Sequence, residues 1–261
     1  MKLRRLTDHV KAQNWFAVGL DLVIVVLGVF IGIQVANWNQ SQADKRLGRA
    51  YVDRLQAELA NDLVLRRNLV AYYAAVLASI DRADALLADA DGDPQATVIY
   101  AYRASEISNA RQMRATWDEI VSSGHVGLLP RDLLASGIAA YYESESVRDA
   151  FEDLQDSRYR LHVRALIPLT AQKAIRAGCS DVRDAAEQVL GFMADCRLQV
   201  PAETLAATAA ALRADPQLKG ELHYQYSQVF TAWANIRGDV VFLERALAAI
   251  KGAPPAVKPA P

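Results

Sequence analysis

The stretch GLDLVIVVLGVFIGIQVANWN, residues 19–39, is the most apolar part of the chain and holds one early acid, Asp21. Between Trp15 and Trp38 the only other strongly polar residues are Gln34 and Asn37. A helix over these residues spans roughly 35 Å, which exceeds the ~30 Å hydrocarbon core of a bilayer. We therefore predict a single transmembrane helix over residues 15–38.

The charges that flank this helix predict its orientation. The segment 1–14 contains four basic residues, Lys2, Arg4, Arg5 and Lys11, and one acid, Asp8. Basic residues favour the cytoplasmic side, and long domains cross the membrane largely regardless of their own charge. We expect residues 1–14 in the cytoplasm, the helix in the membrane and the body on the exported side.

A cleaved signal peptide is the alternative interpretation of the same segment. Ser41 and Ala43 give the small-x-small pattern of a cleavage site. The apolar stretch is, however, much longer than the roughly 7–15 residues of a signal-peptide core. An uncleaved anchor is the favoured interpretation, and cleavage remains the alternative.

The body, residues 39–252, has the composition of an all-α domain. It is rich in Ala, Leu, Arg, Asp and Glu, and the whole chain has only 13 glycines. Apolar residues spaced by three, four or seven predict an antiparallel bundle of three long helices, over about 43–89, 131–177 and 216–251. We expect the first of these to be nearly continuous with the membrane helix. The Pro/Ala-rich tail, residues 253–261, is predicted to be disordered.

Shorter helices are predicted between the long ones. Asp93 and Pro94 have the residue types of an N-cap and a first helical position. Other short helices are expected from a cap at Ser180 or Asp181 to about Ala194, and after Pro201. The near-neutral net charge of −1 gives no basic surface for nucleic acid, so we expect no nucleic-acid partner.

The two cysteines, Cys179 and Cys196, both lie in the body. An exported compartment oxidises such a pair, so we predict a disulfide between them. Two buried thiols are the alternative if the body is cytosolic.

The sequence Thr116-Trp117-Asp118-Glu119 has the pattern of a capping box, in which the threonine hydroxyl and the glutamate carboxylate each accept a backbone N–H. We predict that it starts a short helix that Gly124 ends. Trp117 is expected in the core and Glu119 in the cap. A ligand site formed with Asp118 and His125 is the alternative.

Two stretches, GLDLVIVVLGVFIGIQVANWNQ and ATWDEIVSSGHVGLLPRDLLASGIAAYYES, resemble an uncharacterised bacterial family known as a domain of unknown function. The resemblance implies an N-terminal membrane helix and an α-helical body. Its motif falls on Thr116, Trp117, Glu119, Ser123 and Gly124, with Ile120 in place of the usual leucine. It implies no activity.

Asp21, Gly28 and Gly32 lie on one face of the membrane helix at 100° per residue. A Gly-x-x-x-Gly pair allows close approach of a second helix, and an unpaired carboxylate within the bilayer is costly. We predict that this face pairs with a second copy or with another membrane protein. The alternative is that Asp21 only reaches the headgroups and that the glycines are incidental.

No motif for a catalytic centre, metal site or cofactor site is present. The histidines are far apart at 9, 125, 162 and 223, and the usual zinc, phosphate-binding and nucleophile motifs are missing. The acids between Glu143 and Asp156 are interleaved with arginine, which favours a solvated helix face. The aromatic spacing of His223, Tyr226, Phe230 and Trp233 favours core packing.

These observations favour a membrane-anchored, periplasmic scaffold or accessory subunit that acts by protein–protein interaction. A ligand-sensing extracytoplasmic bundle that signals through a partner membrane protein is the alternative. An enzyme is the weakest of the three hypotheses, because no catalytic motif supports it.

Overall fold

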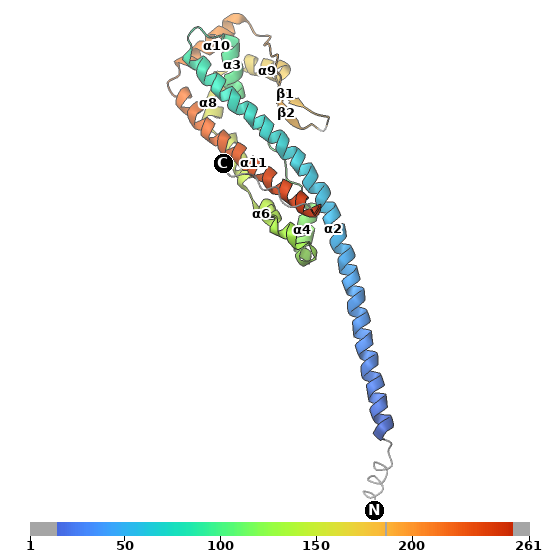
Figure 1. The fold of residues 1–261 in the computed structure, drawn as a ribbon. Coiled ribbons are helices and arrows are strands. Elements are labelled where there is room, and N and C mark those ends of the chain that lie inside the picture. The colour runs from blue at the N-terminus through green and yellow to red at the C-terminus, as the bar shows by residue number, and fades with distance from the viewer. Residues whose placement is uncertain (1–14, 186, 253–261) are drawn as a thin grey trace, which may run out of the picture.

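The computed structural model describes residues 15–185 and 187–252. Its main element is α2, Trp15–Ala88, a single helix of 74 residues. Figure 1 shows the N-terminal part of α2 projecting from the body, and its C-terminal part running through it. The predicted cytoplasmic segment and the predicted disordered tail lie outside the described residues.

The other elements pack around the C-terminal part of α2, and the all-α class is confirmed. They are α3 Pro94–Arg103, α4 Ala115–Ser122, the 3-10 helix η1 His125–Leu128, α5 Arg131–Ala135, α6 Ile138–Glu143, α7 Ser146–Gln155, α8 Arg158–Leu166, α9 Leu169–Gly178, β1 Asp181–Arg183, β2 Val189–Phe192, α10 Ala202–Ala214 and α11 Leu218–Ile250.

The centre of the body is an antiparallel pair formed by α2 and α11, which run side by side in Figure 1. Buried positions on α11 alternate in steps of four and three, as in a coiled coil. They are Leu218, Leu222, Gln225, Val229, Ala232, Ile236, Asp239, Leu243 and Ala246. Buried α2 residues such as Leu59, Asp62, Arg66 and Leu69 keep the same steps. The two helices therefore share one regular seam.

The hydrophobic core is divided into two clusters along this seam. One cluster lies toward the end of α2 and includes Leu69, Tyr73 and Leu222. The other lies nearer the projecting part of α2 and includes Leu55, Trp117 and Leu243. Between them α2 and α11 bury the charged residues Asp62, Arg66 and Asp239.

Several predicted element boundaries are confirmed. Asp93 caps α3, where its carboxylate accepts the backbone N–H groups of Gln95 and Ala96, and Pro94 is the first helical residue. Gly124 adopts a left-handed conformation with φ 73° and separates α4 from η1. A helix follows Pro201, as expected, and α11 closes the bundle.

The predicted long helix over 131–177 is wrong, because the structure has five short helices there, α5 to α9. Gly137 interrupts the helix, because its φ is 90°. A Cβ atom at this position would lie 3.1 Å from the ring of Phe242. Ser157 starts α8 by accepting the N–H of Arg160, and Pro168 lies between the end of α8 and the start of α9. The helices therefore end at these local breaks, although apolar residues recur at helical spacing across them.

The predicted helix between residues 180 and 194 is also wrong. The structure forms an antiparallel hairpin there, with Asp181 opposite Phe192 and Val182 opposite Gly191. A disulfide joins Cys179 to Cys196, and their Cα atoms are 5.1 Å apart. A helix over 181–194 would separate its ends by about 20 Å, which this bond does not allow.

Candidate functional site

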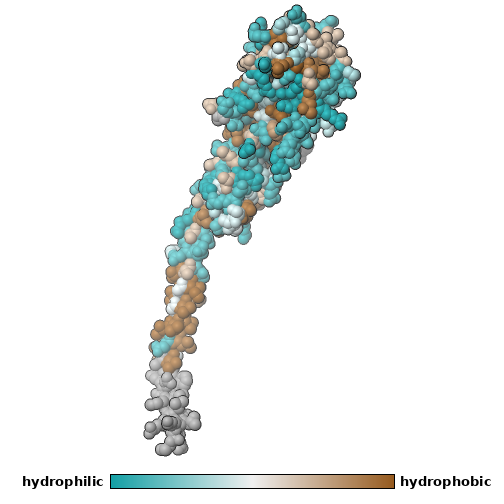
Figure 2. All heavy atoms as spheres, turned by 180° about the vertical axis from the view of Figure 1, so that it is seen from behind, coloured by the Kyte–Doolittle hydropathy of each residue, from teal (hydrophilic) through white to brown (hydrophobic). Residues whose placement is uncertain are grey.

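The N-terminal part of α2 is long and apolar enough to cross a membrane, and it is the one helix of the described chain that meets this test. None of its most apolar stretch is buried against the body. Figure 2 shows it as a mostly apolar rod below a largely hydrophilic body. A helix surface that is apolar on all sides and has no protein around it is suited to lipid.

The predicted pairing face lies on this rod. Asp21, Gly28 and Gly32 are all exposed. A Cβ atom added at Gly28 or Gly32 would meet no other part of the described chain within 4 Å beyond the adjacent backbone of its own helix. This face is therefore open along the predicted span.

A regular row of small residues, which we call the alanine stripe, also runs along α2 from the apolar part into the body. An apolar residue recurs at every seventh position, and its members are Ala36, Ala43, Ala50, Ala57, Val64, Ala71, Ala78 and Ala85. All are exposed except Ala43, which is half-buried. Apolar residues repeated every seven positions are typical of a helix that packs on another helix. The sequence analysis missed this repeat, although the sequence alone contains it.

The residues of the family motif attach α4 to α2. The Thr116 hydroxyl donates to Glu58 Oε1 at 2.7 Å, and its backbone N–H donates to the same carboxylate. Glu119 accepts from Arg54 Nη2 at 2.6 Å. Trp117 is buried and stacks on Tyr142 with ring centroids 5.0 Å apart.

The predicted capping box is therefore wrong. The N-cap of α4 is Arg114, whose own side chain makes no capping hydrogen bond. Glu58 and Arg54 lie one turn apart on α2 and bind the two residues that the box would have used. The interpretation of Trp117 as a core residue is confirmed.

The end of the motif contacts α2 through a histidine. His125 Nδ1 lies 2.9 Å from the Ser123 hydroxyl and 3.0 Å from the Tyr51 hydroxyl. The Ser123 hydroxyl also lies 2.7 Å from the Glu119 carbonyl, to which it donates. A serine whose proton is directed to a carbonyl is not poised as a nucleophile, so the contact supports a structural role.

A buried polar layer separates the two core clusters. Arg66 Nε donates to Asp239 Oδ2 at 2.9 Å, and Arg66 Nη1 donates to the Ala110 carbonyl. Asp62 accepts from the Tyr141 hydroxyl at 2.7 Å and from the backbone N–H of Met113. Burial raises the pKa of both carboxyls, Asp62 and Asp239. The layer fixes the register of α2 against α11 and holds the irregular segment before α4.

The expected core position of the aromatic residues on α11 is wrong. These residues are His223, Tyr226, Phe230 and Trp233. Tyr226 and Phe230 are 42% and 45% exposed, and Trp233 is half-buried with Arg237 stacked 4.5 Å from its ring. The buried seam uses the neighbouring positions Gln225, Val229 and Ala232. The aromatic residues therefore flank the seam.

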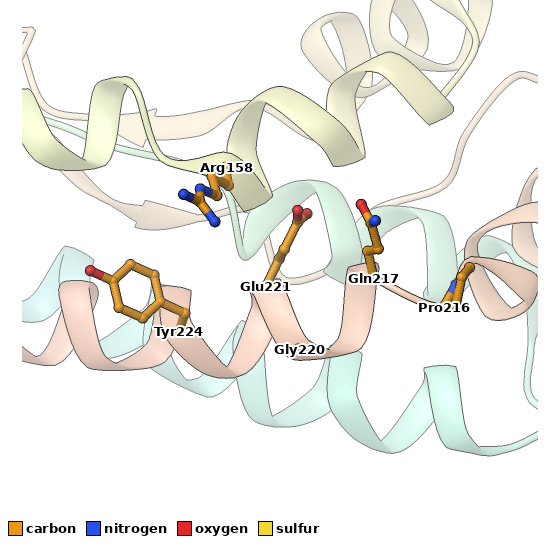
Figure 3. A pocket seen from close by; sticks show the side chains of 6 residues that line it. All are labelled: Arg158, Pro216, Gln217, Gly220, Glu221 and Tyr224. Carbon is orange, nitrogen blue, oxygen red and sulfur yellow. The ribbon is translucent and has the colours of Figure 1, made fainter.

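A pocket of about 620 Å³ lies between the start of α8 and the start of α11. Figure 3 shows the Arg158 side chain above Tyr224, and Glu221 directed from α11 toward α8. Glu221 also contacts His162 at 2.7 Å, and His162 lies 3.1 Å from Asp215. The hydrogen bond with Glu221 raises the pKa of His162, as do the charges of both acids.

In the part of the chain that the structure describes, no group of three or more His, Cys, Asp or Glu side chains could hold a metal ion. The acids around α7 form a solvated face, as expected. Arg148 pairs there with Glu145 at 2.5 Å and with Glu152 at 3.7 Å.

The fold and these contacts define a helical bundle built onto one long helix with an apolar N-terminal part. The chain belongs to the family of unknown function DUF6090, whose model matches residues 21–159, just over half of the chain. The match begins at Asp21, includes the 116–124 motif and ends at the start of α8. No curated protein and no solved structure matches the chain.

Proposed function

We propose that this protein is a membrane-anchored scaffold or accessory subunit that acts by protein–protein interaction and has no catalytic activity. Its partner is a second copy of the chain or another membrane protein, which it meets through the face of α2 that contains Asp21, Gly28 and Gly32. The bilayer is its other binding partner. No cofactor, metal or nucleic acid takes part.

The observation that carries this proposal is the exposed alanine stripe on an unbroken helix. α2 runs without interruption from the apolar part into the seam with α11. Because α2 follows the coiled-coil repeat in its seam, the stripe keeps a constant angle to the buried side over the body. Small residues at this spacing let a second helix approach closely.

We place the apolar part of α2 in a bacterial inner membrane, with the N-terminus in the cytoplasm and the body in the periplasm. The basic residues before α2 support this orientation. The disulfide between Cys179 and Cys196 supports an oxidising compartment for the body. A reporter that is active only in the periplasm should be active when fused after Pro261. Activity of a cytoplasm-only reporter at this position would show the opposite orientation.

Substitutions in the apolar part of α2 test the function itself. Gly28→Leu and Gly32→Leu should weaken association in a membrane two-hybrid assay, because the larger side chain blocks close approach of the backbones. Leu27→Ile and Ile31→Leu are the matched controls, since they change shape but not size. Association that survives both glycine substitutions would contradict the proposal for this face.

A ligand-sensing bundle that signals through a partner membrane protein is a second candidate. The pocket beside His162 favours it, because Arg158, Glu221 and Tyr224 offer charge and an aromatic face to a small molecule. Thermal unfolding with and without a library of periplasmic metabolites separates the two candidates. A metabolite that raises Tm in the wild type but not in Tyr224→Ala would favour sensing.

A further inference from the structure

Three arginines surround one buried acid at the end of the body that lies farthest from the apolar part of α2. We call Arg160 and Arg164 of α8 and Arg176 of α9 the arginine cluster. The acid is Glu106, which follows α3 and is 6% exposed. Figure 1 shows α3, α8 and α9 together at this end of the molecule.

Two of the guanidinium groups are held in place by several contacts. Arg176 Nη2 lies 3.2 Å from Glu106 Oε1, and Arg164 Nη2 lies 3.4 Å from Glu106 Oε2. Arg164 also donates to the Ser105 hydroxyl at 3.0 Å and to the Tyr102 hydroxyl at 3.1 Å. The Tyr102 ring stacks 4.4 Å from the Arg164 guanidinium carbon. Such contacts pre-organise the donors before a ligand arrives.

Positive charge exceeds negative charge in the cluster. Arg160 donates to the Ser105 carbonyl and forms no ion pair with a carboxylate of the described residues. Burial and the neighbouring Arg164 lower the pKa of Arg160. Three guanidinium groups thus face one directly paired carboxylate, Glu106, and the more distant charge of Asp181. A further anion would relieve the repulsion between the guanidinium groups.

A further observation shows unmet donor capacity here. Arg164 Nη2 is buried and, apart from its 3.4 Å ion-pair contact with Glu106, has no hydrogen-bond partner in the described chain. The Arg176 side chain is 48% exposed and that of Arg164 20% exposed, so the cluster reaches solvent at one edge.

We propose that the arginine cluster binds the oxyanion group, phosphate or carboxylate, of a small soluble ligand. Guanidinium groups suit this class of ligand, because their planar N–H donors match two oxygens at once. A lipid headgroup is a poor candidate for geometric reasons. α2 passes the cluster near Tyr72, and the helix from Trp38 to Tyr72 measures about 50 Å.

Glu106 occupies part of this site and competes with the ligand. Its pKa is raised by burial, and the arginines oppose that shift. A neutral residue in place of Glu106 leaves the three guanidinium groups without an ion-paired carboxylate. The proposal therefore predicts opposite effects for substitutions of Glu106 and of the arginines, which a general loss of folding does not produce.

Calorimetric titration of inorganic phosphate into the full-length protein in detergent, at constant ionic strength, tests the proposal. The wild type should show saturable binding. Arg160→Gln and Arg176→Gln should weaken binding about tenfold or more, and Glu106→Gln should strengthen it. Arg148→Gln is the matched control, because Arg148 is exposed and pairs with acids on α7. It should bind as the wild type does.

A parallel titration with succinate distinguishes phosphate ligands from carboxylate ligands. Saturable binding of either probe with this order of affinities supports the site. Absence of saturable binding for both probes overturns the proposal. So does an equal loss in Arg148→Gln, or weaker binding by a Glu106→Gln variant whose circular dichroism matches the wild type.

Discussion

Arg66 and Asp239 form a buried ion pair that joins α2 to α11 with an Nε–Oδ2 distance of 2.9 Å. Their side chains are 6% and 8% exposed, and they lie where the two core clusters meet. Removing one partner of such a pair leaves a buried charge without compensation. Asp239→Ala should therefore lower the free energy of unfolding by about 3–5 kcal/mol in urea titrations.

The exposed pair Arg67–Glu244 joins the same two helices at 2.9 Å and provides the control. Glu244→Ala should cost only about 0–1 kcal/mol, because water already solvates both charges. Equal costs for the two substitutions would mean that the buried layer does not hold the helix pair together.

Thr116 should matter more to stability than Glu119. Thr116→Val removes a hydrogen bond and leaves the half-buried Glu58 carboxylate with one donor fewer, which should cost about 1–3 kcal/mol. Glu119→Ala removes a solvent-exposed ion pair and should cost less than Thr116→Val. Chemical unfolding of both variants checks the order. The reverse order would restore the capping-box interpretation.

His162 should make the stability of the body depend on pH. Its pKa is raised in the folded state by the hydrogen bond with Glu221 and by Asp215. Its contribution is then fully present below the ordinary histidine pKa of about 6.5 and is lost as the pH rises through the raised value.

The difference in unfolding free energy between the wild type and His162→Gln should therefore shrink as the pH rises above about 6.5. Glu221→Gln should reduce the same dependence, because it removes the acceptor that contributes most. A difference that is constant from acid to alkaline pH would show that the contacts of His162 do not favour its charged form.

The disulfide gives a prediction about both stability and location. Peptide mapping of the normally expressed protein without reduction should find Cys179 bonded to Cys196. A Cys196→Ser variant should lose about 2–5 kcal/mol of stability, because the loop between these positions is no longer closed in the unfolded chain. Free thiols in the native protein would remove the main support for a periplasmic body.

The parts of the fold that could be predicted from sequence depend on residues near one another in the chain. The apolar run that contains Asp21, the cap at Asp93 with Pro94, and the stop at Gly124 each act within one turn of helix. The breaks between α5 and α9 are different. Gly137 is needed there because Phe242, more than 100 residues later, packs against it.

In the candidate sites, too, features that depend on nearby residues could be predicted and features that depend on distant residues could not. Asp21, Gly28 and Gly32 could be placed on one face from helical spacing alone, and so could the alanine stripe that the sequence analysis missed. The partners of Thr116 and Glu119 could not be predicted, because Glu58 and Arg54 come from a helix about 60 residues earlier. The arginine cluster likewise assembles from α8 and α9 around Glu106, and spacing in the sequence does not reveal it.

Cysteine cross-linking in native membranes can show directly whether α2 pairs through its exposed alanine stripe. Ala57→Cys and Ala71→Cys place thiols on the stripe, whereas Ser227→Cys and Ala234→Cys place them on the exposed side of α11, which packs against the buried side of α2. We expect rapid cross-linking at both stripe positions, to a second copy or to one partner, and little at the two controls. Equal cross-linking at all four positions, or none on the stripe, would contradict pairing through the stripe.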